Sequence, residues 1–398
     1  MATKSDGPLD AAPRVVWYND PLWRGRFFQA LTLLAVIAVA WTIVHNTAVN
    51  LERRNIAQGF GFLSTTAGFD VAQAAIDFPK DASYGRAILV GLVNTVIVAV
   101  SGVIFATIFG FLVGIGRLSH NFVISRLATA YVELLRNIPL LLQIFFWYFA
   151  VLGVLPAPRQ SLEPIGGWVF INNRGLYLPE FHFGAFAGWG IVGGLVFGLV
   201  VSWVIRRWAR IRQAETGAQF PSGWVSLGLI AGLPLALFAA SGFDLSLVAP
   251  RKSTFNLAGG IQVIPELIAL VLALSTYTAS FIAEVVRAGI LAVSHGQTEA
   301  ARSLGLSHGH TLRLVVIPQA MRVIIPPLTN QYLNLTKNSS LAVAIAYPDL
   351  VSVGGIVLNQ SGQAIEVIVI WMAIYLGTSV ATALIMNVYN QRMAIVER

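Results

Sequence analysis

The chain has 398 residues, of which 56% are hydrophobic and only 11% are charged, and its mean hydropathy is +0.72. A typical soluble domain carries roughly 25% charged residues, so a soluble protein of 42.9 kDa is excluded and an integral membrane protein is expected. The net charge of +8 does not require a nucleic-acid partner, because a membrane protein retains Lys and Arg on its cytoplasmic side, and the lack of cysteine excludes disulfides and thiolate chemistry.

Charge-free apolar stretches recur along the chain at lengths that suit a bilayer crossing, which needs about 20 residues. One further stretch is interrupted only by Lys337. We expect transmembrane helices near residues 28–48, 88–115, 131–154, 185–205, 224–242, 264–290, 324–346 and 366–390. These runs are too long for strands and lack alternation at period two. The sequence therefore predicts an all-α integral membrane protein with about eight transmembrane helices.

The distribution of basic residues predicts the orientation. With the N-terminus inside, the cytoplasmic segments hold about twice as many Lys and Arg as the outer loops, so both termini are expected in the cytoplasm. Residues 49–85 and 155–184 are expected to form polar outward loops. Glycines at small-xxx-small spacing in the span that begins near residue 185 predict close packing against another helix, which we expect to belong to the same chain.

The segment 295–318 combines a glycine with two short predicted helices. Glu299 to Ser303 is expected to form the first helix, with Gly305 as its C-terminal stop. The second is expected to start after Ser307 and to be broken by Pro318. This arrangement suits a docking surface for a soluble partner, the alternative being an ordinary amphipathic loop. The residues expected to contact such a partner are Glu299, Ala300, Ala301, Arg302 and Gly305.

Several motifs together resemble one family. Glu299-Ala300-Ala301 followed by Gly305 and by residues 315–318 resembles the EAA loop of permease subunits from ABC importers, with conservative departures at Val315 and Ile317. Asn94-Thr95 and the segments 131–143, 284–290 and 326–341 are similar to motifs of the polar amino-acid (His/Glu/Gln/Arg/opine) permeases, in the same order. The chain is thus identified as resembling a permease subunit of a bacterial ABC importer.

The resemblance implies a MetI-like permease core in two parts, residues 86–153 and 263–392, with the EAA coupling loop at 295–318. The remaining segments depart from the family's usual core. They are a cytoplasmic tail (1–27), an extra first helix with a periplasmic loop (28–85) and an insertion with two transmembrane helices (154–262). In size and layout the chain looks like the larger membrane subunit of general L-amino-acid transporters.

By this resemblance the chain is expected to move L-amino acids from periplasm to cytoplasm by alternating access, in the bacterial inner membrane. The implied partners are an ABC ATPase dimer that binds ATP and Mg, a second paralogous permease subunit forming a heterodimer, and a periplasmic amino-acid-binding protein. Neither Lys4-Ser5 nor Lys252-Ser253 follows a glycine as a P-loop requires. No cofactor is therefore expected in this chain, and ATP hydrolysis is expected in a separate one.

Uncharged polar residues near the middle of the sixth predicted span are candidates for the substrate pathway. Such groups suit a zwitterion, although they can equally bond to carbonyls of their own helix. Lys337 lies in a segment that Pro326 and Pro327 predict to be irregular. Together with its neighbours it would meet a substrate carboxylate or stabilise a gate, or else snorkel or pair with another helix. The candidates are Thr276, Tyr277, Thr278, Ser280, Lys337, Asn338 and Ser339.

The other charged and histidine residues are expected to have structural rather than catalytic or metal-binding roles. Glu284 and Arg287 are three residues apart and are expected to pair on one helical face. His308 and His310 do not share a helical face, so no metal site is expected, and no catalytic arrangement is recognisable. Two other functions remain: a gradient-driven secondary transporter, which needs acids deep in the bundle, and a channel or structural membrane subunit, which has no use for an EAA loop.

Overall fold

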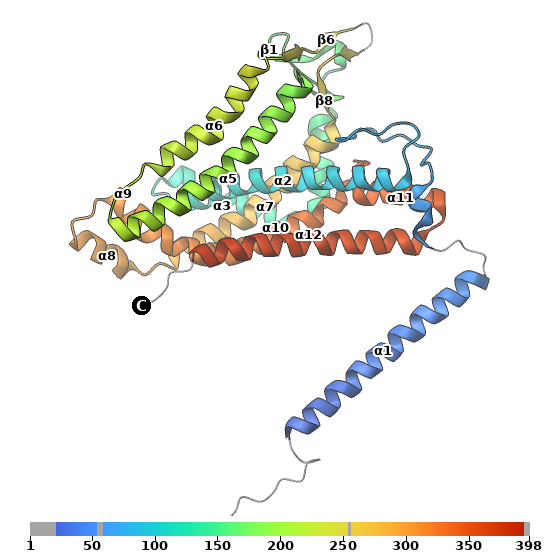
Figure 1. Ribbon diagram of the computed structural model, residues 1–398, viewed down its shortest axis with the longest axis horizontal. Coiled ribbons are helices and arrows are strands. Elements are labelled where there is room, and N and C mark those ends of the chain that lie inside the picture. Colours follow the sequence, from blue (N-terminus) through green and yellow to red (C-terminus); the bar gives the residue numbers. More distant parts are fainter. Residues whose placement is uncertain (1–20, 54–58, 254–255, 394–398) are drawn as a thin grey trace, which may run out of the picture.

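The computed structural model describes residues 21–53, 59–253 and 256–393, and most of these lie in long helices (Figure 1). Within the described residues, seven helices are long and apolar enough to cross a membrane, or eight if one bent pair forms a single span. This confirms the predicted helical membrane class. The helices are α1 (Pro21–Arg53), α2 (Tyr84–Arg117), α3 (Phe122–Asn137), α4 (Leu140–Phe145), α5 (Ala185–Thr216), α6 (Ser222–Ala240), α7 (Pro265–Leu291), α8 (His295–Ser303), α9 (His308–Thr311), α10 (Ile317–Asn338), α11 (Leu350–Ser361) and α12 (Ala364–Met393).

The first helix is longer than predicted and stands apart from the bundle (Figure 1). Helix α1 begins at Pro21, within the segment that we expected to be a tail up to residue 27, because the apolar side chains Leu22, Trp23 and Phe27 extend the helical run toward the N-terminus. Residues 1–20 of that expected tail lie outside the described residues.

The predicted helix over residues 131–154 is instead a pair of helices bent by 108°. Helix α3 ends at Asn137 because Pro139 disfavours the α conformation for the residue before it, and Ile138 is extended. The amide of Gln143 donates to the carbonyls of Leu135 and Ile138 at 2.9 and 3.0 Å, which stabilises the break. Helix α4 then continues into a π-helical turn, Phe146–Leu152.

The prolines in and just before the seventh predicted span (324–346) disturb the helix less than expected, and two predictions were wrong. Pro318 does not end a helix: it follows a π-helical turn, Leu312–Val316, and lies in the first turn of α10, where its missing N–H and its ring are accommodated. Pro326 and Pro327 lie inside an unbroken α10. The irregular backbone starts beyond them, in a 3-10 segment, Ser339–Ile345.

Short strands occur where the sequence showed only loops. They are too short for alternation to be recognised in the sequence. Four of them form an antiparallel sheet in the order β1-β2-β3-β8, while β4 pairs with β5 and β6 with β7. Figure 1 shows the strands at the opposite end of α5 and α6 from α8. Their bounds are β1 (Leu162–Ile165), β2 (Val169–Asn172), β3 (Gly175–Leu178), β4 (Glu180–Phe183), β5 (Leu245–Val248), β6 (Arg251–Lys252), β7 (Leu257–Ala258) and β8 (Ile261–Val263).

The glycines of α5 serve packing within the chain, as predicted. A Cβ on Gly198 would lie 2.7 Å from the carbonyl oxygen of Leu229 in α6, and one on Gly194 would lie 3.1 Å from the backbone of Pro234. Only glycine allows this approach of the two helices.

Helix α7 forms the centre of the bundle and packs against α2 and α10. It carries fully buried side chains along its length, among them Leu270, Leu274 and Ile282. The polar side chains of α7 therefore face either α2 or α10, or the spaces beside them, according to their position around the helix.

Candidate functional site

A polar groove lies between α7 and α10 and has a volume of about 320 Å³. Tyr277 and Phe281 of α7 form an aromatic wall, with ring centroids 5.0 Å apart. The carboxamides of α10 that line it each offer N–H donors and a carbonyl acceptor. Such a lining can bind both the carboxylate and the ammonium group of a zwitterion without placing a net charge in the membrane. The lining residues are Tyr277, Thr278, Phe281, Gln331, Asn334 and Asn338.

Of the candidates chosen from the sequence, Tyr277, Thr278 and Asn338 meet in this groove. The hydroxyls of three others donate to backbone carbonyls of nearby turns: Thr276 to Leu272 at 2.7 Å, Ser280 to Tyr277 at 2.6 Å, and Ser339 to Thr336 at 2.7 Å. Lys337 is exposed in the last turn of α10 and is not among the lining residues.

Three lining residues were not selected from the sequence: Phe281, Gln331 and Asn334. A signal for the two carboxamides was present, because positions 331, 334 and 338 are spaced to share one face of a helix. That face became recognisable only once α10 proved to be a regular helix through Pro326 and Pro327.

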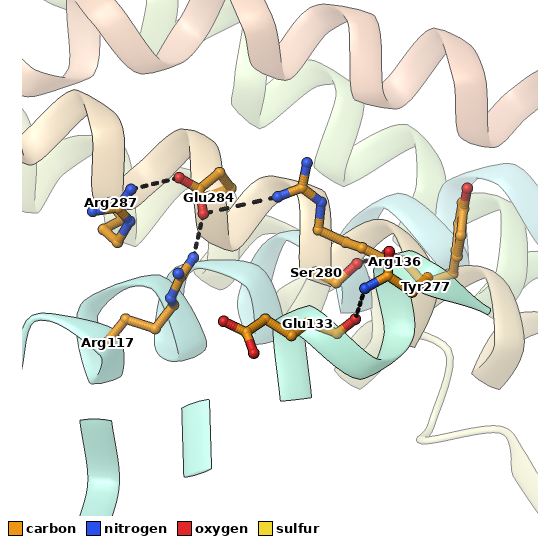
Figure 2. Close-up of polar contacts among 8 residues, drawn as sticks. Arg117, Glu133, Arg136, Tyr277, Ser280, Glu284 and Arg287 are labelled. Carbon is orange, nitrogen blue, oxygen red and sulfur yellow. Dashed lines mark hydrogen bonds and ion pairs between the residues drawn. The ribbon is translucent and has the colours of Figure 1, made fainter. Parts of the chain in front are cut away.

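Figure 2 shows a charged cluster around Glu284 at the end of α7 that leads to α8. Arg287 donates from Nη2 to Oε1 of Glu284 at 2.7 Å, which confirms the predicted pair. Oε2 of Glu284 binds the guanidinium of Arg117, the last residue of α2, and lies 3.9 Å from Nη1 of Arg136 in α3. The cluster thus joins three helices, and its two interhelical arginines could not be assigned from sequence spacing.

Arg136 also connects this cluster to the polar groove. Its guanidinium carbon lies 5.1 Å from the centroid of the Phe281 ring, which forms part of the groove wall. A cation over an aromatic face is attracted by the ring quadrupole. Arg136 therefore contacts both Glu284 and a residue of the groove wall.

The predicted docking segment begins four residues after α7 ends. Helix α8 starts at His295 rather than Glu299, and Gly305 follows its C-cap with φ +76°, as expected for a glycine stop. The second helix begins after Ser307, as predicted. Of the five proposed contact residues, Ala301 is buried, and the others are exposed: Glu299, Ala300, Arg302 and Gly305.

The polar pair in α2 holds the turn that precedes α11. Asn94 donates from Nδ2 to the carbonyls of Gln73 and Pro348, at 2.7 and 2.9 Å. The hydroxyl of Thr95 accepts the backbone N–H of Leu350 at 2.9 Å. These bonds explain two polar side chains in an apolar helix, since buried backbone groups need partners.

Replacing Asn94 with leucine, which has a similar size, is expected to destabilise the protein by about 1–3 kcal/mol, because the carbonyls of Gln73 and Pro348 lose their donor. Thermal unfolding in detergent measures this. Thr329→Val is a suitable control, since the hydroxyl of Thr329 donates to the carbonyl of Ile325 within its own helix, α10. Equal stability of the Asn94→Leu variant and the wild type would contradict the assignment.

The two histidines show no sign of a shared ligand. His310 Nδ1 lies 2.7 Å from the hydroxyl of Ser307. Among the described residues, no group of three or more His, Asp or Glu side chains is arranged to hold a metal ion.

Comparison with known proteins places these features in a family context. Residues 190–398 match the family described as the inner membrane component of binding-protein-dependent transport systems. The chain is 55% identical, over 95% of its length and 94% of the relative, to the general L-amino acid transport system permease protein AapQ of Rhizobium johnstonii. It is 49% identical, over 96% and 97%, to the putative amino-acid ABC transporter permease protein YhdX of Escherichia coli. It is 40% identical, over 100% of both chains, to the glutamate/glutamine/aspartate/asparagine transport system permease protein BztB of Rhodobacter capsulatus.

Proposed function

Since the chain belongs to the family of binding-protein-dependent transport system inner membrane components, we propose that it is the permease subunit of an ATP-driven ABC importer that moves L-amino acids into the cytoplasm by alternating access. By family it is a transport subunit and not an enzyme. The proposal that the substrates are amino acids rests on the similarity, along nearly the whole chain, to proteins whose names describe them as amino-acid permeases.

The groove between α7 and α10 supports an amino-acid substrate. Its walls combine an aromatic pair with carboxamides from Gln331, Asn334 and Asn338. Hydrogen-bonding groups of both kinds suit the substrate's two charged ends, and the absence of a formal charge among the lining residues suits a net-neutral substrate. Three of the pathway residues proposed from the sequence line this groove: Tyr277, Thr278 and Asn338.

Coupling to ATP is proposed to run through the segment 295–318. Helix α8 projects at one end of the bundle, opposite the strands (Figure 1), and its exposed face carries Glu299, Ala300 and Arg302. We assign this end to the cytoplasm, with both termini there, and to contact with an ATPase dimer that binds ATP and Mg. The second permease subunit is a paralogue, and a periplasmic amino-acid-binding protein docks on the outer segments 49–85 and 155–184.

The test is purification of the chain with its natural neighbours, followed by reconstitution in vesicles. We expect an ATPase to co-purify, its activity to rise with a loaded binding protein, and labelled amino acid to accumulate only with ATP. Competition by acidic, neutral and basic amino acids then defines the substrate range. Uptake driven by an ion gradient alone, or flux without saturation, would contradict the proposal.

Asn334→Leu is expected to raise the amino-acid concentration needed for half-maximal uptake about tenfold, since one hydrogen bond to a charged substrate group is lost. Binding-protein titration in the reconstituted system measures this. Thr276→Val serves as the control, because Thr276 lies on α7 but its hydroxyl is bound to Leu272 of its own helix. A similar effect of both substitutions would argue against the groove as the pathway.

A further inference from the structure

Four arginines lie close together near the end of α5: Arg206, Arg207, Arg210 and Arg212. Within the described residues, none of them forms an ion pair with a carboxylate. Figure 1 shows that α5 ends on the same side of the bundle as α8 and α9. These four cations therefore have no counterion among the residues that the structure describes.

Arg206 forms one end of a groove of about 390 Å³ between α5 and α6. Its Nε donates to the hydroxyl of Ser226 at 2.8 Å, which fixes the guanidinium at the groove. Arg210 lies one turn further along the same face of α5 and donates from Nε to the carbonyl of Arg206 at 3.3 Å, so its side chain lies next to Arg206, although it does not itself line the groove. The rest of the groove is formed by α6: Gly223, Trp224, Leu227 and Ile230.

The position of the groove corresponds to a membrane surface. The apolar span of α5 begins at Ala187, so Arg206 follows after about 20 residues, the length that crosses the hydrocarbon core. Trp224 is 79% exposed and Leu227 is 56% exposed beside it. Tryptophan is enriched at the level of lipid headgroups, where a phosphate and the start of an acyl chain would adjoin these residues.

We propose that this groove binds an anionic phospholipid such as phosphatidylglycerol. The guanidinium groups of Arg206 and Arg210 hold its phosphate, and Trp224, Leu227 and Ile230 contact an acyl chain. Guanidinium matches phosphate geometry with two parallel hydrogen bonds. A phosphatidylcholine headgroup carries a cation that the clustered arginines repel. The apolar side of the groove favours a lipid over free phosphate.

The proposal is tested on the full-length chain, co-purified with its natural subunits, in micelles containing equal amounts of phosphatidylglycerol and phosphatidylcholine. Native mass spectrometry counts the lipids retained. We expect phosphatidylglycerol to be retained preferentially by the wild type, and the Arg206→Gln/Arg210→Gln variant to lose about tenfold in that preference, since juxtamembrane arginines bind anionic lipid additively.

Arg212→Gln is the matched control. It removes the same charge from the same helix end, but Arg212 lies about 120° around the helix from Arg206, beyond the buried Ala209, and its guanidinium lies over Trp208. We expect it to keep the preference within about twofold. Because Arg206 also supports the α5–α6 contact through Ser226, Trp224→Ala provides a second test that leaves all charges in place and should weaken lipid retention.

Several outcomes would overturn the proposal: equal retention of the two lipids, an unchanged preference in the double variant or in Trp224→Ala, or an equal loss in Arg212→Gln. Displacement of the lipid by millimolar inorganic phosphate would identify a simple anion site instead. Unchanged size-exclusion profiles and melting temperatures are required of each variant, and Arg210→Gln alone replaces the double variant if the latter unfolds.

Discussion

Replacing Glu299 with lysine is expected to reduce ATP-driven amino-acid uptake to below about a tenth of the wild-type rate, because reversing a charge at a complementary contact costs several kcal/mol. The fold should be unaffected. Glu299 is exposed on α8, and within the described residues its side chain contacts only His295, at 3.1 Å. Uptake into reconstituted vesicles and stimulation of the ATPase by the loaded binding protein are the measurements.

Glu215→Lys is the control for this charge reversal, because Glu215 is also exposed but lies in the last turn of α5, outside the segment 295–318. It should leave uptake unchanged.

Gly305→Val tests the segment 295–318 through its backbone conformation. A Cβ at Gly305 meets no atom within 4 Å, but its φ of +76° is unfavourable for a branched residue. Normal uptake in both Glu299→Lys and Gly305→Val would contradict the coupling role of this segment.

The sequence predicted the helical membrane class because each long apolar run crosses a bilayer on its own, whatever its neighbours do. It was less informative where geometry depends on local compensation. The break at Pro139 depends on Gln143 satisfying carbonyls across a 108° bend. Pro318 appeared to be a helix breaker, yet the π-helical turn before it accommodates the ring.

For the site, too, local contacts could be predicted from the sequence, but contacts between distant segments could not. Contacts between residues close in sequence, such as Glu284 with Arg287 or Gly305 after α8, follow from helical spacing. Contacts between helices do not, because Arg117 meets Glu284 only when α2 packs on α7. The two-to-four-residue strands between residues 162 and 263 are defined by their antiparallel partners rather than by their own sequence.

Glu284→Gln is expected to destabilise the protein by about 2 kcal/mol, less than the 3–5 kcal/mol of a fully buried pair, because the Glu284 side chain is 30% exposed. Neutralisation leaves the guanidinium of Arg117, only 12% exposed, without its counterion. Arg136→Gln should cost about 0–1 kcal/mol, since its Nη1 is 3.9 Å from the carboxylate and its side chain is 41% exposed. Thermal and denaturant unfolding distinguish the two variants.

The same cluster should affect transport, because α7 ends only a few residues before α8. If the ion pairs at Glu284 hold this end of α7 against α2, then movement of α8 is transmitted to the groove only while they persist. Glu284→Gln should therefore lower uptake per ATP hydrolysed, and a double-mutant cycle with Arg117→Gln should show a coupling energy of about 1–2 kcal/mol. Additive effects of Glu284→Gln and Arg117→Gln would show that the two residues act independently. The proposed transmission of movement from α8 to the groove through this ion pair would then be contradicted.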